Sequence, residues 1–123
     1  MQKLNSKFKS DLKYRSYQFG LAVIELCNTL PNKRSAWIIA DQLIRSSTSV
    51  GANLIEARAS SSRLEFKKFH EIALKSANES EYWLNLLQDA TLATREAIAP
   101  LLQEITEIAN MLAKGVMKLK QKI

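Results

Sequence analysis

Apolar side chains recur every three or four residues along most of this 123-residue chain, which is the spacing of one face of an α-helix. Within residues 12–30 the spacing is carried by Phe19, Val23, Leu26 and Leu30. It stops at Pro31-Asn32, a pair of residues that disfavours further helix. The pattern therefore predicts a first helix over residues 12–30.

A second helical pattern begins near Ser35, which we expect to be its N-cap. One apolar row contains Trp37, Ala40, Ile44, Ser47, Gly51 and Leu54, and a second row contains Ala36, Leu43, Val50 and Ala57. Two adjacent rows make the predicted helix apolar over a wide arc. We therefore expect neighbouring segments to pack against more than one of its sides.

A serine-rich loop over residues 59–62 separates the second helix from the third. Ser62 and Glu65 have the spacing of a capping box, in which the serine accepts a first-turn amide and the glutamate reaches back to the cap amide. The seam of the third helix is Phe66, Phe69, Ala73, Ser76, Ser80, Trp83 and Leu87. This helix is expected to run to about Ala90.

A fourth helix is predicted after a break over residues 91–94. Its apolar row is Ile98, Leu101, Ile105, Ile108, Leu112, Val116 and Leu119. Proline fits a first helical turn and disturbs a helix interior. The helix therefore either begins at Ala99-Pro100 or has a short leading turn that is kinked at Pro100, and the sequence leaves both alternatives open.

Four helices joined by short connections predict an all-α fold, an antiparallel up-down-up-down four-helix bundle. The composition agrees, because three glycines and two prolines leave little material for hairpin turns. No linker or internal repeat divides the chain. We expect one domain over residues 1–123, with residues 1–10 forming a flexible basic tail.

Positive charge gathers at the two ends of the chain, which has a net charge of +6. The candidate nucleic-acid-binding residues are Lys3, Lys7, Lys9, Lys13, Arg15, Lys114, Lys118, Lys120 and Lys122. Both chain ends lie at the same end of an up-down bundle, so these cations could share one surface, with Tyr14 and Tyr17 stacking on bases. Without a base-reading motif, contact with RNA or DNA would be to phosphates. The alternative is solvated charge that complements the last helix dipole.

Catalytic and metal-binding patterns do not emerge from the sequence. The single histidine, His70, has no Glu-x-x-His spacing, and the single cysteine, Cys27, lies among apolar residues. No serine stands in a nucleophile motif or a phosphate loop. We therefore expect no metal, no cofactor and no enzymatic activity.

The longest apolar runs are far shorter than the ~20 residues that span a bilayer, and the basic start of the chain is followed by no apolar signal core. The sequence therefore predicts a cytoplasmic protein without membrane contact.

Four polar residues, Arg45, Asn53, Glu56 and Arg63, interrupt the second helix or open the third. A half-buried charge must be paired, because an unpaired one is costly. We therefore interpret these residues as a structural polar network that fixes helix register and subunit contacts, with direct ligand binding as the alternative.

Residues 42–57, which read QLIRSSTSVGANLIEA, carry a family resemblance together with a second spaced set. That set is Ser62, Glu65, Phe66, Phe69, Ile72, Ala73, Ser76, Ala77 and Glu79. The chain resembles the four-helix-bundle proteins encoded in intervening sequences of bacterial large-subunit ribosomal RNA genes. It departs from them at three places. This chain has Ser46-Ser47 where the family usually has Ala-Ala, Gly51 where the family has proline, and Ala57 where the family has glycine. The loss of that helix-ending glycine predicts a second helix that continues toward Arg58 or Ala59.

The resemblance implies a homo-oligomer, commonly a five-fold ring, with no established enzymatic activity. A related branch of the fold serves diversity-generating retroelements as an accessory protein, associating with a reverse transcriptase and with nucleic acid. We therefore expect a non-enzymatic pentameric accessory protein that binds nucleic-acid backbone through its basic ends, possible partners being a reverse transcriptase or an RNA-processing enzyme. The alternative is a structural or protein-protein interaction oligomer without a nucleic-acid role.

Overall fold

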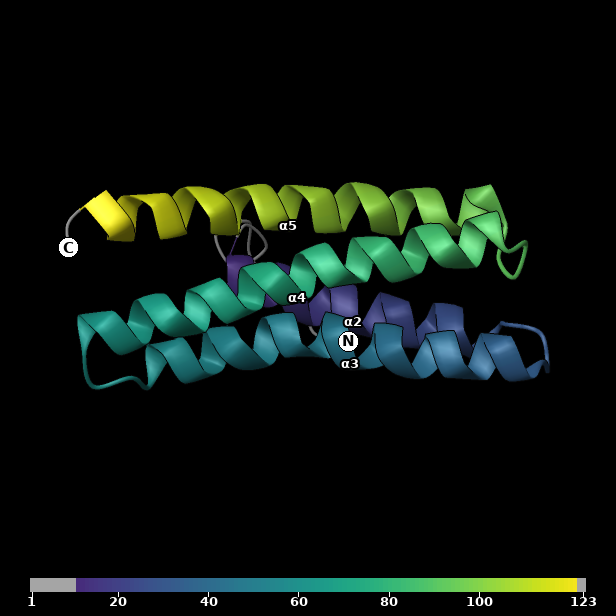
Figure 1. Ribbon diagram of the computed structural model, residues 1–123, viewed down its shortest axis with the longest axis horizontal. Helices are drawn as coiled ribbons and strands as arrows, with labels where there is room; N and C mark the ends of the chain where they lie inside the picture. Colours follow the sequence, from purple (N-terminus) through teal and green to yellow (C-terminus); the bar gives the residue numbers. More distant parts are fainter. Residues whose placement is uncertain (1–10, 122–123) are drawn as a thin grey trace.

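Four helices make up nearly all of the computed structural model, which describes residues 11–121. They are α2 (Leu12–Asn28), α3 (Arg34–Arg58), α4 (Arg63–Asp89) and α5 (Arg95–Gln121). Figure 1 shows them lying lengthwise beside one another. The predicted all-α fold with four helices is confirmed for the described residues, which contain no strand.

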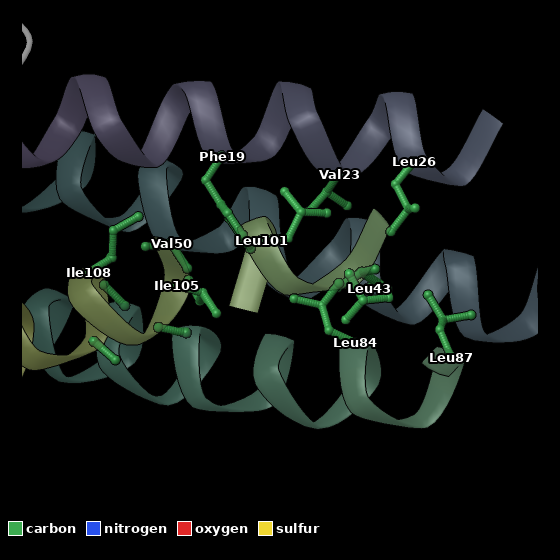
Figure 2. Packing of buried hydrophobic residues seen from close by; sticks show 14 of the residues in the cluster. Phe19, Val23, Leu26, Leu43, Val50, Leu84, Leu87, Leu101, Ile105 and Ile108 are labelled. Carbon is green, nitrogen blue, oxygen red and sulfur yellow. The ribbon is translucent and has the colours of Figure 1, made fainter. Parts of the chain in front are cut away.

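Each helix packs against two others, which gives the core four sides. α3 contacts α2 and α4, and α5 contacts α4 and α2. Figure 2 shows side chains from all four helices turned toward a common interior. The largest fully buried apolar side chains are Phe19 and Val23 from α2, Leu43 and Val50 from α3, Leu84 and Leu87 from α4, and Ile98, Ile105, Ile108 and Leu112 from α5. Burial of such side chains contributes roughly 1.5 to 3 kcal/mol each.

Side chains cap the starts of α2 and α4. The Asp11 carboxylate accepts a hydrogen bond from the amide of Lys13 at 2.8 Å. At α4, Ser62 Oγ accepts from the Glu65 amide at 3.1 Å, as predicted. Glu65 Oε1 accepts from the Ser61 amide at 3.0 Å, one residue before the cap. The capping box is therefore present with its second bond displaced by one residue.

Two helix starts differ from the simplest reading of the sequence. Ser35 is not the N-cap of α3, because Lys33 is already the extended residue before the helix and its carbonyl accepts from the Trp37 amide at 3.1 Å. α5 begins at Arg95, behind a Thr94 hydroxyl that accepts from the Ala97 amide at 3.1 Å. α5 therefore does not begin at Ala99-Pro100, and Pro100 lies inside the helix after a leading turn.

α2 is the shortest helix, with 17 residues against 25 in α3 and 27 in both α4 and α5. Near its start, Arg15 is bonded to Glu104 and Glu107 of α5. α5 continues beyond Glu107 to Gln121, a distance of about 20 Å. Figure 1 shows α4 and α5 extending past the start of α2. At this end, the bundle therefore consists mainly of α3, α4 and α5.

None of the helices within residues 11–121 combines the length and the apolar character that crossing a membrane would require.

Candidate nucleic-acid interface

Cations collect at the end of the bundle where α3 ends, α4 begins and α5 ends. The residues are Arg58 of α3, Arg63, Lys67 and Lys68 of α4, Lys114, Lys118 and Lys120 of α5, and Lys13 at the nearby start of α2. We call these eight residues the basic end. Two shallow hollows connect its elements, one lined by Arg58, Arg63 and Leu119 and the other by Lys13, Arg58 and His70.

Most cations of the basic end have no acidic partner. Within residues 11–121 the one ion pair there joins Lys120 Nζ to Glu71 Oε2 at 4.0 Å. The other seven form no salt bridge with a described residue. Free ammonium and guanidinium groups on one surface are the groups that neutralise phosphates and release counterions.

The amides at the start of α4 do not add an open anion site to this surface. Ser62 and Glu65 already accept the hydrogen bonds of the capping box. Glu65 also places a negative charge in the first turn of the helix. The positive potential of the basic end therefore comes from side chains on four helices and not from the α4 dipole.

Arg15 is held by carboxylates. Its Nε donates to Glu104 Oε2 at 2.9 Å, and its Nη2 donates to Glu104 Oε1 and Glu107 Oε1, both at 2.8 Å. These bonds raise the pKa of the guanidinium above its ordinary value and lower the pKa of Glu107. Arg15 is therefore a predicted cation whose guanidinium is already held by hydrogen bonds to two carboxylates of the chain.

The structure brings together four of the nine predicted cations, namely Lys13, Lys114, Lys118 and Lys120, although Lys13 lies toward the middle of the bundle. Lys3, Lys7, Lys9 and Lys122 lie outside the described residues. The two tyrosines differ in surroundings. Tyr14 is half-buried, whereas Tyr17 is exposed beside the apolar residues Leu21 and Ile55.

Arg45, Asn53, Glu56 and Arg63 do not join into one network within residues 11–121. Arg45 donates to Gln42 of its own helix and is bonded to Glu79 of α4. Asn53 donates to Ser49, one turn earlier. Glu56 and Arg63 are exposed. The predicted grouping does not form because eight residues of helix place Arg45 and Asn53 about 12 Å apart.

Sequence reasoning missed a polar cluster between α3 and α4. Trp83 Nε1 donates to Glu79 Oε2 at 2.8 Å, and the same carboxylate is bonded to Arg45. The hydrogen bond from the Trp83 indole lowers the pKa of Glu79 most, and Arg45 lowers it further. The signal was present in the sequence as Glu79 and Trp83, four residues apart on one helix face.

The basic residues Arg58, Arg63, Lys67 and Lys68 were also missed as members of the candidate interface. They lie in the middle of the sequence, and only the position of the α3–α4 loop brings them to the ends of the chain. A count of charges at the turns of the predicted bundle would have found them.

His70 and Cys27 lie apart from each other. His70 Nδ1 donates to the Phe66 carbonyl at 2.9 Å, and its ring lies 4.4 Å from that of Phe66. Burial raises the pKa of the Cys27 thiol to about 11. Among residues 11–121, no three His, Cys, Asp or Glu side chains are grouped so that they could hold a metal ion.

Comparison with known proteins adds a family and a structural neighbour. Residues 9–114 match the family described as 23S rRNA-intervening sequence protein. A crystal structure from Bacteroides thetaiotaomicron VPI-5482, described as a protein with unknown function from the S23 ribosomal protein family, is similar with a TM-score of 0.81 and 37% sequence identity. The match covers 86% of this chain and 98% of that one. No curated protein matches the chain.

Proposed function

This chain belongs to the 23S rRNA-intervening sequence protein family, and from that premise we propose that it is a non-enzymatic, oligomeric accessory protein that binds the phosphate backbone of nucleic acid. The observation that carries the proposal is the basic end, where seven cations from four helices have no acidic partner among the described residues. Each of its two hollows has two cations in its lining, Arg58 with Arg63 in one and Arg58 with Lys13 in the other, although Asp11 also lines the second.

Binding of this kind is governed by counterion release. The binding constant falls with salt, with a logarithmic slope of about 0.9 per phosphate neutralised on duplex DNA and about 0.7 on single strands. Phe66 lines both hollows of the basic end, but no base-reading motif accompanies it, so we expect contact with phosphates and not with base edges. RNA or DNA of generic sequence is therefore the expected ligand.

Matched charge-neutralising variants test this function. The triple variant Arg58→Gln, Arg63→Gln and Lys118→Gln removes three cations of the basic end. The control, Lys33→Gln, Arg34→Gln and Arg95→Gln, removes three exposed cations from the opposite end of the bundle. Titration of a labelled RNA at several salt concentrations should show a slope reduced by about 2 to 3 in the first variant alone.

Absence of RNA and DNA binding by the wild type at low salt would contradict the proposal, as would affinity that does not change with salt. Equal weakening by both variants would attribute binding to net charge and not to the basic end.

The finer architecture that we propose is an antiparallel up-down-up-down bundle assembled into a pentameric ring. The order of contacts supports the antiparallel arrangement, because Ser46 pairs with Ser80 whereas Ser49, further along α3, pairs with the earlier Ser76 of α4. A ring would multiply the +6 charge of one chain and create a stronger field around the particle. Molar mass in solution, measured by light scattering, tests the assembly.

Such a ring would present nucleic acid to a cytoplasmic reverse transcriptase, as in diversity-generating retroelements, or to an RNA-processing enzyme.

The alternative function is a structural or protein-protein interaction oligomer, which the exposed Tyr17, Trp37 and Ile55 favour. Replacement of Lys114, Lys118, Lys120 and Lys122 by glutamine separates the two functions. Loss of RNA with an intact oligomer supports the first, and a wild type that assembles without binding nucleic acid supports the second.

A further inference from the structure

An aromatic ring lies among the cations of the basic end. Phe66, near the start of α4, lines both of the hollows there, and so does Arg58 of α3. The two hollows therefore meet at these two residues. Phe66 remains 36% exposed, so part of an apolar ring is open to a ligand beside positively charged side chains.

A second ring supports Phe66 from one turn further along α4. His70 Nδ1 donates to the Phe66 carbonyl at 2.9 Å, and the two ring centroids lie 4.4 Å apart with an angle of 38° between the planes. His70 also lines the second hollow. Contact between the rings restricts the motion of Phe66, which reduces the entropy that is lost when a flat ligand stacks on it.

Each hollow places cations next to the ring. Arg58 and Arg63 line the first hollow, and Arg58 and Lys13 line the second. None of these three forms a salt bridge with a described residue. The second hollow also has Asp11, whose carboxylate caps α2. A phosphate is therefore better placed in the first hollow, where both charged lining residues are arginines.

Cations beside an exposed ring are typical of proteins that bind single-stranded nucleic acid, in which a positive groove follows the backbone while bases stack on aromatic side chains. The hollows have volumes of about 350 and 340 Å³, at the lower end of the range for small-molecule sites. Each is therefore of a size for a single nucleotide and not for a duplex. The faces of duplex bases are covered by their neighbours, and a base is exposed at least cost in a strand that is already single.

We propose that the basic end is selective for single-stranded nucleic acid, with one base stacked on Phe66 and the adjoining phosphate held by Arg58 and Arg63. The inference rests on the proposed binding of nucleic-acid backbone and names the form of nucleic acid that is bound. Every base has a flat π face, so stacking selects single strands over duplexes without selecting a sequence. Phe66 then has the stacking role that the sequence suggested for Tyr14 and Tyr17.

An abasic strand separates stacking from charge. Three labelled ligands are titrated into the wild-type protein at low salt, namely a short oligothymidylate, the same oligomer with every base removed, and a duplex of equal length. The oligothymidylate should bind about fivefold or more tightly than the abasic strand, because only the former can stack. It should also bind more tightly than the duplex, although charge alone would favour the duplex with its denser phosphates.

Variants of Phe66 assign the stacking to one side chain. Phe66→Leu keeps an apolar side chain without a π face, so affinity for the oligothymidylate should fall about fivefold or more while affinity for the abasic strand is unchanged. Phe66→Trp should bind as the wild type does. Tyr82→Leu is the matched control, because Tyr82 is 59% exposed on the same helix and lies about 24 Å further along it. Helicity and the dependence of affinity on salt should be retained in all three variants, since both sites are exposed and no charge changes.

Several results would overturn the inference while backbone binding stands. They are equal affinity for the oligothymidylate and the abasic strand, tighter binding of the duplex than of the single strand, and salt-dependent binding that Phe66→Leu does not weaken. Equal weakening of the thymidylate and abasic strands by Phe66→Leu would show that the ring shapes the hollows and does not stack on a base. A wild type that binds none of the three ligands at low salt would contradict the proposed function as well.

Discussion

The two sides of α3 are built differently. Toward α4, hydroxyl groups pair across the interface, with Ser46 Oγ 2.9 Å from Ser80 Oγ and Ser76 Oγ donating to Ser49 Oγ at 2.9 Å. Toward α2, the helix presents Gly51, and the hydroxyl that faces it, Ser16 Oγ, has no partner within residues 11–121. Small residues therefore lie on both sides of α3, and among residues 11–121 Ser16 Oγ on the α2 side is left without a hydrogen-bond partner.

The difference separates an interface whose hydroxyls are paired from one that leaves a buried hydroxyl unpaired among the described residues. An unsatisfied buried hydroxyl costs about 1 to 3 kcal/mol. The α3–α4 seam avoids this cost through its serine pairs and is covered outside by Arg45, Glu79 and Trp83. The α2–α3 seam has apolar walls and no such cover. Substitutions in the first seam are therefore expected to cost more stability than substitutions in the second.

Ser80→Leu should have the largest effect on stability. Ser80 is fully buried, and its hydroxyl both pairs with Ser46 and donates to the Ser76 carbonyl. A leucine would overpack the seam and leave Ser46 without its side-chain partner, at a cost of about 3 kcal/mol in the free energy of unfolding. Urea unfolding measures the loss.

Ala52→Leu is the control on the other seam. Ala52 is exposed and lines a hollow between α2 and α3, so the variant should change the unfolding free energy by no more than about 0.5 kcal/mol. Equal destabilisation by Ser80→Leu and Ala52→Leu would contradict the difference between the α3–α4 and α2–α3 seams.

Glu79→Gln should cost about 1.5 kcal/mol at neutral pH, because Trp83 and Arg45 both bond to the carboxylate and its partial exposure weakens the interaction. The folded-state pKa of Glu79 is lowered. Its stabilisation is therefore fully present above the unfolded pKa of about 4.3 and is lost as pH falls through the folded value.

Urea unfolding at a series of pH values should show a flatter acid limb in Glu79→Gln than in the wild type. Glu56→Gln is the control, because Glu56 is exposed and forms no salt bridge with a described residue. An unchanged acid limb in Glu79→Gln would show that the carboxylate is not coupled to folding.

The helices were predictable from the sequence because the 3.6-residue period is local. The orientation of α3 was not, since two apolar rows lie side by side on it. Ala36 is fully buried, whereas the neighbouring Trp37 is 58% exposed. The choice between the rows depends on where α2 and α4 lie, which no local pattern encodes.

The candidate interface was predictable in part for a similar reason. Charge at the chain ends indicated Lys13, Lys114, Lys118 and Lys120 once the bundle was assumed. Arg15 also looked available in the sequence, yet its partners Glu104 and Glu107 are about 90 residues away along the chain. Pairing over that separation is a property of the packed helices.

Alanine substitutions at the buried Ser46 and Ser16 should change the free energy of unfolding in opposite directions. Ser46→Ala removes a satisfied hydroxyl and leaves Ser80 with one partner fewer, which should cost about 1 kcal/mol. Ser16→Ala removes a buried hydroxyl that has no partner among residues 11–121, and it should stabilise the chain by about 1 kcal/mol. Both are measured by urea unfolding. A destabilised Ser16→Ala variant would mean that the hydroxyl is satisfied within the chain.

Gly20→Ala should have the smallest effect, and it tests whether the α2–α3 seam is optimised for folding. Alanine is favoured over glycine in a helix interior by about 0.5 to 1 kcal/mol, and the nearest atom to a Cβ at Gly20 is Thr48 Cγ2 at 3.8 Å. The variant should therefore unfold at slightly higher urea concentration, by an amount matching Gly115→Ala, whose added Cβ has no atom within 4 Å. A gain at Gly115 with a loss at Gly20 would show that α2 and α3 already touch too closely there for a methyl group, and that the glycine serves the packing of α2 on α3.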